Sequence, residues 1–186
     1  MALKSTIFRA ALNISDIDRG YYADHVLTVA RHPSETNERM MTRVLAFALY
    51  SSHAKEPLEF GKGLSSDDEP ALWERDLTGR ITQWIEVGIP DEKLLRRACG
   101  RSDAVVLLAY GGGRTVDMWW QANREALLRQ DKLTVKSVSS TCSKALAAMA
   151  DRALDLQCMI QDGEIWFSDA SERVLVEISQ FMPAAE

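Results

Sequence analysis

The amino-acid sequence predicts a mixed α+β fold, in which a mixed β-sheet is flanked by helices and has an N-terminal hairpin and a C-terminal β-meander. Three observations predict it. Two segments of period-two alternation surround a polar turn within residues 1–31, helix and strand patterns alternate between residues 34 and 150, and alternation returns in residues 152–186. Strands that alternate with helices, followed by a run of strands, are typical of a mixed sheet covered by helices.

Length and composition are those of one globular domain. The chain has 186 residues, of which 46% are hydrophobic and 26% are charged, and this balance excludes a disordered or fibrous chain. No internal repeat and no linker rich in proline or serine divides the sequence. We therefore expect residues 1–186 to form a single domain.

Three features predict a cytoplasmic protein with no membrane segment. The longest apolar run, Ala104–Tyr110, is far shorter than the roughly 18 residues of a spanning helix. The start of the chain, MALKSTIFRA, lacks the apolar core and the cleavage pattern of a signal peptide. Cys99, Cys142 and Cys158 show no CxxC spacing, so we expect neither a zinc site nor a disulfide framework.

The first expected elements are a hairpin and a helix. Residues 7–14 and 25–30 alternate on either side of the polar turn Ser15–Gly20, which predicts two paired strands. Ser34 is the expected N-cap of the helix, with acidic residues in the first turn. The apolar residues of this helix recur at intervals of three and four and predict one buried face: Met41, Val44, Leu45, Ala48 and Leu49.

The middle of the chain contains the expected inner strands of the sheet. A short strand at Leu58–Phe60 is followed by the acidic turn Ser65–Pro70, which we expect to cap a short helix through Trp73. Ile81–Val87 alternates and predicts a strand. Ala104–Tyr110 is apolar throughout, as expected for a strand that is buried on both faces.

The remaining elements before the meander are three helices and a strand. Short helices are expected at Asp91–Ala98 and at Ser143–Ala150. A helix follows Gly111–Gly113, and residues 132–136 predict a strand with one solvated face.

The meander is built around the turn signal Asp162-Gly163, which is typical of a type I′ hairpin. A two-residue loop at this position places Ile160 opposite Ile165 and Cys158 opposite Phe167. The last strand is expected to contain three alternating apolar residues: Val174, Val176 and Ile178.

Four acidic residues are the candidate metal ligands. Glu35 and Glu38 open the first helix, Asp68 lies in the acidic turn, and Glu86 stands beside Trp84 on an expected inner strand. If Glu35 or Glu38 converges with Asp68 and Glu86, their oxygens suit a hard cation. In the structural alternative, the helix dipole stabilises Glu35 and Glu38 at the start of the helix, and Asp68 caps a turn. Glu86 then pairs with an arginine, because an unpaired buried charge is very costly.

A basic stripe follows Glu86 on the next expected helix. Lys93, Arg96, Arg97 and Arg101 recur at i, i+3, i+4 and i+8. One interpretation is a face that contacts phosphates, and the alternative is an ordinary solvated face. The net charge of −5 argues against a strong non-specific DNA binder but leaves room for a local basic face.

Four segments carry a resemblance to a known family. They are His32–Met41, Asp67–Pro70, Trp84–Glu92 and Ile160–Trp166. Together they resemble the YaeQ family of bacterial proteins over essentially the whole chain, a family whose biochemical role is unsettled. The resemblance implies a variant of the PD-(D/E)XK nuclease fold, a mixed sheet flanked by helices.

The same resemblance implies metal-assisted hydrolysis of phosphodiester bonds. In that superfamily a helix acid, an Asp and a (D/E)xK strand bind Mg²⁺, and the Lys positions or activates water. Glu35 or Glu38 resembles the helix acid, Asp68 the Asp and Glu86 the strand acid, with Mg²⁺ or Mn²⁺ as the implied cofactor. The sequence departs from the pattern at Gly88, which stands where the lysine is expected.

Two functions follow. The first is a YaeQ-like protein with a nuclease-like fold and a degenerate acidic metal site, which lacks robust nuclease activity and binds nucleic acid or a protein partner. The alternative is a Mg²⁺-dependent nuclease in which Lys93, or Arg97 on the same helix, replaces the motif lysine beside the catalytic acids. The deciding observation is whether Glu38, Asp68 and Glu86 converge beside a basic group.

Overall fold

The computed structural model describes residues 5–53, 56–62 and 69–183. The described strands form two mixed sheets, so the mixed α+β class is confirmed but the expectation of a single sheet is corrected. The first sheet has five strands, in spatial order β10 (Arg173–Leu175), β9 (Glu164–Ser168), β8 (Ala153–Gln161), β1 (Thr6–Asp16) and β2 (Tyr21–Arg31). The second has six, in spatial order β11 (Ile178–Met182), β7 (Leu133–Val138), β6 (Ser102–Ala109), β5 (Ile81–Val87), β4 (Leu72–Arg75) and β3 (Glu59–Phe60).

Both predicted hairpins are confirmed in the five-stranded sheet. The antiparallel pair β1–β2 places Phe8 opposite Val29. In the β8–β9 hairpin, Ile160 lies opposite Ile165, and the turn residues Asp162 and Gly163 have φ values of 53° and 78°. These angles are those of the predicted type I′ turn, whose twist matches that of the flanking strands.

The six-stranded sheet carries both predicted inner strands. Its centre is the parallel set β5, β6 and β7, which pair in the order of the chain. β4 pairs antiparallel with β5 and places Trp73 opposite Trp84, so the predicted helix through Trp73 is wrong. Pairing with the long strand β5 decides the conformation of this short segment, which carries little local signal of its own.

The end of the chain crosses from one sheet to the other. The residues expected to form a single last strand divide between β10, which pairs with β9, and β11, which pairs antiparallel with β7. The single strand through Val176 is therefore corrected to two, because each half meets a different sheet edge.

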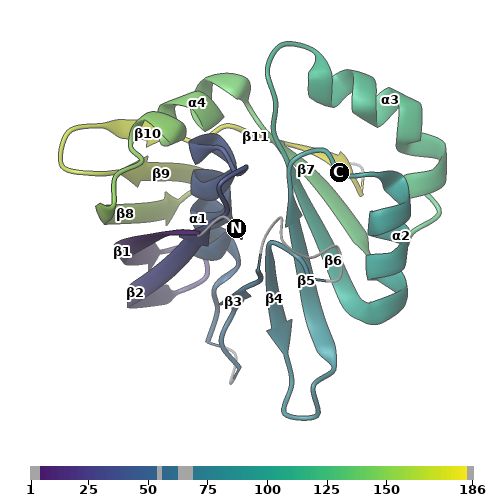
Figure 1. The fold of residues 1–186 in the computed structure, drawn as a ribbon, viewed down its shortest axis with the longest axis horizontal. Coiled ribbons are helices and arrows are strands. Elements are labelled where there is room, and N and C mark those ends of the chain that lie inside the picture. The colour runs from purple at the N-terminus through teal and green to yellow at the C-terminus, as the bar shows by residue number, and fades with distance from the viewer. Residues whose placement is uncertain (1–4, 54–55, 63–68, 184–186) are drawn as a thin grey trace.

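Helices cover both faces of the six-stranded sheet. α1 (Asn37–Tyr50) lies between the two sheets beside α4 (Ser140–Ala148), whereas α2 (Glu92–Arg101) and α3 (Thr115–Leu127) lie on the opposite face (Figure 1). α1 begins after the N-cap Thr36 rather than Ser34, and α4 starts three residues earlier than predicted. Ser34 is part of the preceding turn, where its backbone N–H donates to Nδ1 of His32 at 3.1 Å.

Two hydrophobic cores follow from this arrangement. The larger core joins the inner face of the five-stranded sheet to α1, α4 and one face of the six-stranded sheet, through residues such as Leu12, Met41 and Ile85. The smaller core lies under α2 and α3, with Leu95 and Leu107 fully buried. Within the described ranges, no helix is long and apolar enough to cross a membrane.

Candidate functional site

The turn before α1 directs one acidic side chain into the protein. The backbone N–H of Glu35 donates to the carbonyl of His32 at 2.8 Å, and the N–H of His32 donates to Oε2 of Glu35 at 3.3 Å. Glu35 is only 4% exposed. Thr36 then caps the helix by accepting from the N–H of Arg39 at 3.1 Å. This compact turn holds the Glu35 carboxylate beside the first two turns of α1.

Two arginines on α1 bind the Glu35 carboxylate. Nη1 of Arg39 donates to Oε1 at 2.8 Å, and Nη1 of Arg43 donates to Oε1 and Oε2 at 3.0 and 2.9 Å. Arg39 and Arg43 are four residues apart and lie on one side of α1, from which both contact the carboxylate in the preceding turn. Arg43 has no exposed surface, so its charge depends on this carboxylate.

Glu86 joins the same cluster from β5. Its Oε1 accepts from Nη2 of Arg39 at 3.2 Å and from the backbone N–H of Val87 at 3.2 Å. Burial raises the pKa of Glu86 to about 7, because removal of the carboxyl from water outweighs the opposing effects of Arg39, the Val87 N–H and Arg43. We call Glu35, Arg39, Arg43 and Glu86 the buried charge cluster.

Arg39 is the centre of the buried charge cluster. One guanidinium nitrogen contacts Glu35 and the other contacts Glu86, so a single cation links the start of α1 to β5. Glu86 is therefore paired with an arginine in this structure, as the structural alternative for Glu86 expected.

The other predicted site residues lie elsewhere. Oε1 of Glu38 accepts from the hydroxyl of Ser143 on α4 at 2.6 Å. Lys93 is exposed in the first turn of α2, where its backbone N–H donates to the N-cap Asp91 at 2.9 Å. Asp68 lies outside the described residues. Within residues 5–53, 56–62 and 69–183, no three His, Cys, Asp or Glu side chains are placed to hold a metal ion, so these side chains do not form a fitting set for a divalent cation.

Comparison with known proteins decides the family. The family model described as YaeQ protein matches residues 1–178. The chain belongs to the YaeQ family. It is 42% identical over 179 residues to proteins of Salmonella typhi and Escherichia coli (strain K12), covering 96% of this chain and 97% of each relative, and both are named "Uncharacterized protein YaeQ".

Two solved YaeQ structures share the whole architecture. The YaeQ protein of Xanthomonas axonopodis pv. citri is 46% identical with a TM-score of 0.88, over 95% of this chain and 98% of that one. The YaeQ protein of Pseudomonas syringae is 36% identical with a TM-score of 0.89, over 97% of both chains. The described residues thus share their fold with solved YaeQ proteins, and the resemblance found in the sequence is confirmed at the level of the family.

Gly88, where the resemblance implies a lysine, has a backbone conformation that disfavours a side chain. Gly88 has a φ of 97°, which residues with a side chain rarely adopt, and its N–H donates to the carbonyl of Leu108 at 3.1 Å. A Cβ at this position would lie 3.7 Å from the ring of Tyr110. A lysine here would strain the backbone, so the local fold disfavours the residue that the resemblance implies at this position.

Sequence reasoning missed Arg39 and Arg43. Both occupy inward positions of α1, and a charged residue on an amphipathic helix is ordinarily assigned to the solvated face. The available signal was the spacing: Glu35 precedes Arg39 by four residues and Arg43 by eight. Nε and Nη2 of Arg43 find no hydrogen-bond partner among the described residues, and its guanidinium lies 5.3 Å from the ring centroid of Phe60.

Proposed function

We propose that this YaeQ chain is a variant of the PD-(D/E)XK fold whose acidic positions serve internal ion pairs, and that it binds nucleic acid without robust cleavage. The parallel centre β5–β6–β7, the helices on both faces and the acid near the end of β5 support the relation to that fold. An acid at the start of α1 supports it as well.

One observation carries the loss of cleavage. Arg39 lies between Glu35 and Glu86 at 2.8 and 3.2 Å, so a guanidinium already contacts the two carboxylates that a metal ion would need. A divalent cation would have to displace Arg39 and leave its charge unpaired in a buried place. Because breaking a buried ion pair costs about 3–5 kcal/mol, the ion pairs compete strongly with metal.

The glycine at position 88 supports the same proposal. Nuclease chemistry of this kind needs a lysine beside the strand acid, and the backbone at Gly88 disfavours any side chain. The candidate replacement Lys93 is exposed on α2, and its described contact is made by its backbone to Asp91.

Thermal melts with and without Mn²⁺ test this proposal. We expect the melting temperature of the wild type to be unchanged by Mn²⁺ and a DNA duplex to remain intact. Arg39→Met frees Glu86 and leaves Glu35 with Arg43 alone, so a rise of the melting temperature with Mn²⁺ is expected in this variant alone. Arg80→Met is the matched control, because Arg80 pairs with Asp103 on the surface, with their side chains 66% and 39% exposed.

The opposite result would establish the alternative, a Mg²⁺-dependent nuclease. In that case a hundredfold excess of Mn²⁺ over Kd would stabilise the wild type by about 2.7 kcal/mol and raise its melting temperature by roughly 5–10 °C. Glu86→Gln would remove both the shift and the cleavage of DNA.

A further inference from the structure

α2 presents a strongly basic face to solvent. The helix Glu92–Arg101 contains four basic residues and one acid, although the whole chain has a net charge of −5. Lys93, Arg96 and Arg97 are all exposed, and we call these three residues the α2 basic face. The α2 basic face is therefore positively charged on a protein whose net charge is negative.

The fold makes little use of these three charges. Arg96 approaches Glu92 only at 4.0 Å, with 60% of its side chain exposed. The side chains of Lys93 and Arg97 have no ion pair among the residues that the structure describes. They line an open surface depression of about 490 Å³ together with Asp91 and Leu94. The cations are therefore available to a ligand.

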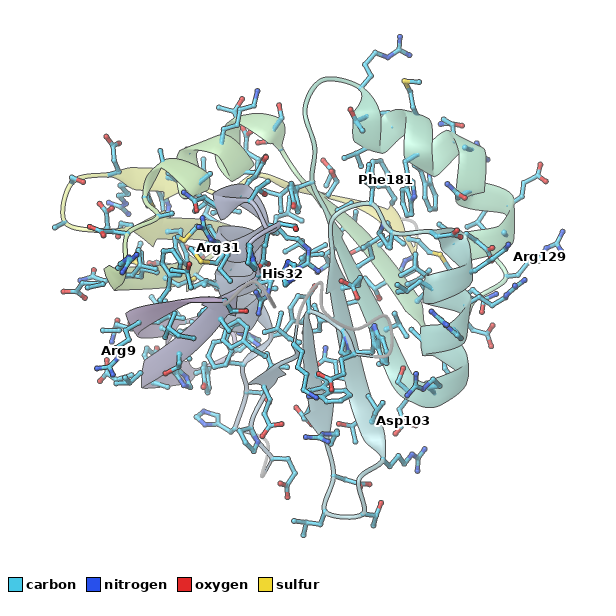
Figure 2. The ribbon with its side chains drawn as sticks, viewed as in Figure 1. Arg9, Arg31, His32, Asp103, Arg129 and Phe181 are labelled. Carbon is cyan, nitrogen blue, oxygen red and sulfur yellow. The ribbon has the colours of Figure 1, made fainter. Side chains whose placement is uncertain are left out.

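The opposite side of α2 fixes the orientation of the basic face. Leu95, Ala98 and Cys99 are buried and pack in the core under α2 and α3. The helix is tied to this core, so the basic face cannot turn inward. On the ribbon, α2 lies at the outer right of the molecule, and Figure 2 shows the exposed Arg129 on the same side.

We propose that the α2 basic face binds the phosphate backbone of nucleic acid without reading its sequence. Side chains three or four residues apart on a helix are about 5–6 Å apart, which brings several cations onto a chain that carries a phosphate at every nucleotide. The choice of nucleic acid as the ligand rests on the proposed function above. The inference that this surface binds a ligand depends only on the exposed charges of α2.

A membrane surface fits this face less well. Helices that lie on membranes bury an apolar face in the bilayer, whereas the apolar face of α2 is already occupied by the protein core. The outer surface of α2 offers charge without an apolar face. Phosphate groups held along a polymer are the ligand that such a surface suits best.

A salt titration with a fluorescein-labelled DNA duplex of arbitrary sequence tests the proposal. If three phosphates are neutralised, affinity falls about 40-fold between 50 and 200 mM salt, since each contact contributes about 0.9 to the slope of log K against log salt. The triple variant Lys93→Gln/Arg96→Gln/Arg97→Gln should lose at least about tenfold in affinity at 50 mM salt and most of the slope.

The matched control changes the net charge equally on the other side of the molecule. Arg9→Gln/Lys144→Gln/Arg152→Gln replaces three exposed cations, and Figure 2 shows Arg9 on the side away from α2. We expect this control to bind DNA as the wild type does. An equal loss in both triple variants would overturn the proposal, because net charge alone would then explain binding.

Three further outcomes test the ligand, the role of α2 and the loss of cleavage separately. Binding to vesicles of phosphatidylserine and phosphatidylcholine, with none to duplex or single-stranded DNA, would overturn the nucleic-acid ligand. If neither triple variant loses affinity for DNA, the role of α2 is overturned. The expected effect of Mn²⁺ on the melting temperature of Arg39→Met would still stand. Cleavage of the bound duplex with Mn²⁺ would overturn the loss of nuclease activity and leave the α2 basic face in place.

Discussion

The buried charge cluster and the α2 basic face lie on opposite faces of the six-stranded sheet and are built in opposite ways. In the cluster, two arginines form ion pairs with two glutamates, and the most exposed of these side chains, that of Arg39, is 12% exposed. On α2, three cations face solvent with one weak contact to an acid. Charges that pair inside a protein are committed to its structure, whereas unpaired charges on the surface are free for a ligand.

The difference predicts where mutations act. Breaking a pair inside the cluster leaves an uncompensated charge that is hidden from water, so the cost appears in the free energy of unfolding. Removing a cation from the α2 basic face leaves no buried charge unpaired, so the cost appears in binding alone.

Glu35→Ala should have the largest effect on stability. It removes the carboxylate that binds both Arg39 and Arg43, and it should lower the free energy of unfolding by about 3–5 kcal/mol in urea denaturation. The matched control is Glu59→Ala, which removes the partner of Arg75 on the surface and should cost no more than about 1 kcal/mol. Equal losses in the two variants would contradict the structural role of the cluster.

Glu86→Gln should show the next largest effect, and its size should depend on pH. The pKa of Glu86 is raised from 4.5 to about 7 in the folded protein. The folded state therefore binds this proton more tightly, so Glu86 contributes stability at low pH that is lost as pH rises through about 7. Glutamine removes this dependence. Relative to the wild type, Glu86→Gln should gain about 3 kcal/mol between about pH 4.5 and pH 8.

Urea denaturation at several pH values measures this gain. Glu125→Gln is the control, because Glu125 is exposed on α3 and lies outside the cluster. A difference between Glu86→Gln and the wild type that stays constant across this pH range would show that Glu86 keeps an ordinary pKa. The cluster would then be less isolated from water than its burial indicates.

Local patterns predicted the elements of this fold better than their arrangement. The Asp162-Gly163 hairpin and the strand Ile81–Val87 follow from turn chemistry and from alternation, which act over a few residues. The division into two sheets depends on β1 pairing in parallel with β8, where Arg9 meets Ala153. No local pattern reports a pairing between segments so far apart in the chain.

The sequence indicated the acids of the buried charge cluster but not its arginines, because the arginine contacts depend on packing between distant segments. Glu35 and Glu86 were found because acids on a buried strand or at a helix start need a partner. That partner proved to be Arg39, whose inward direction depends on how α1 packs against β5. The positive φ of Gly88 likewise depends on its backbone contact to β6, and this contact cannot be predicted from the local sequence.

Two glycines, one beside the buried charge cluster and one in α2, should respond to alanine in opposite ways. Gly88→Ala places a Cβ on a backbone with a φ of 97° and should cost about 1–2 kcal/mol of unfolding free energy. Gly100 lies within α2 with no atom within 4 Å of an added Cβ, so Gly100→Ala should stabilise by about 0.5 kcal/mol. Thermal melts should therefore shift in opposite directions, and an unchanged melting temperature in Gly88→Ala would show that this position tolerates a side chain.

The smallest effect on stability is expected on the α2 basic face itself. Lys93→Gln/Arg97→Gln removes two exposed cations that have no described ion pair, so the free energy of unfolding should stay within about 0.5 kcal/mol of the wild type. The same variant should bind the DNA duplex more weakly than the wild type. A loss of stability above about 1 kcal/mol would mean that these charges support the fold, and the two regions would then differ in exposure without differing in use.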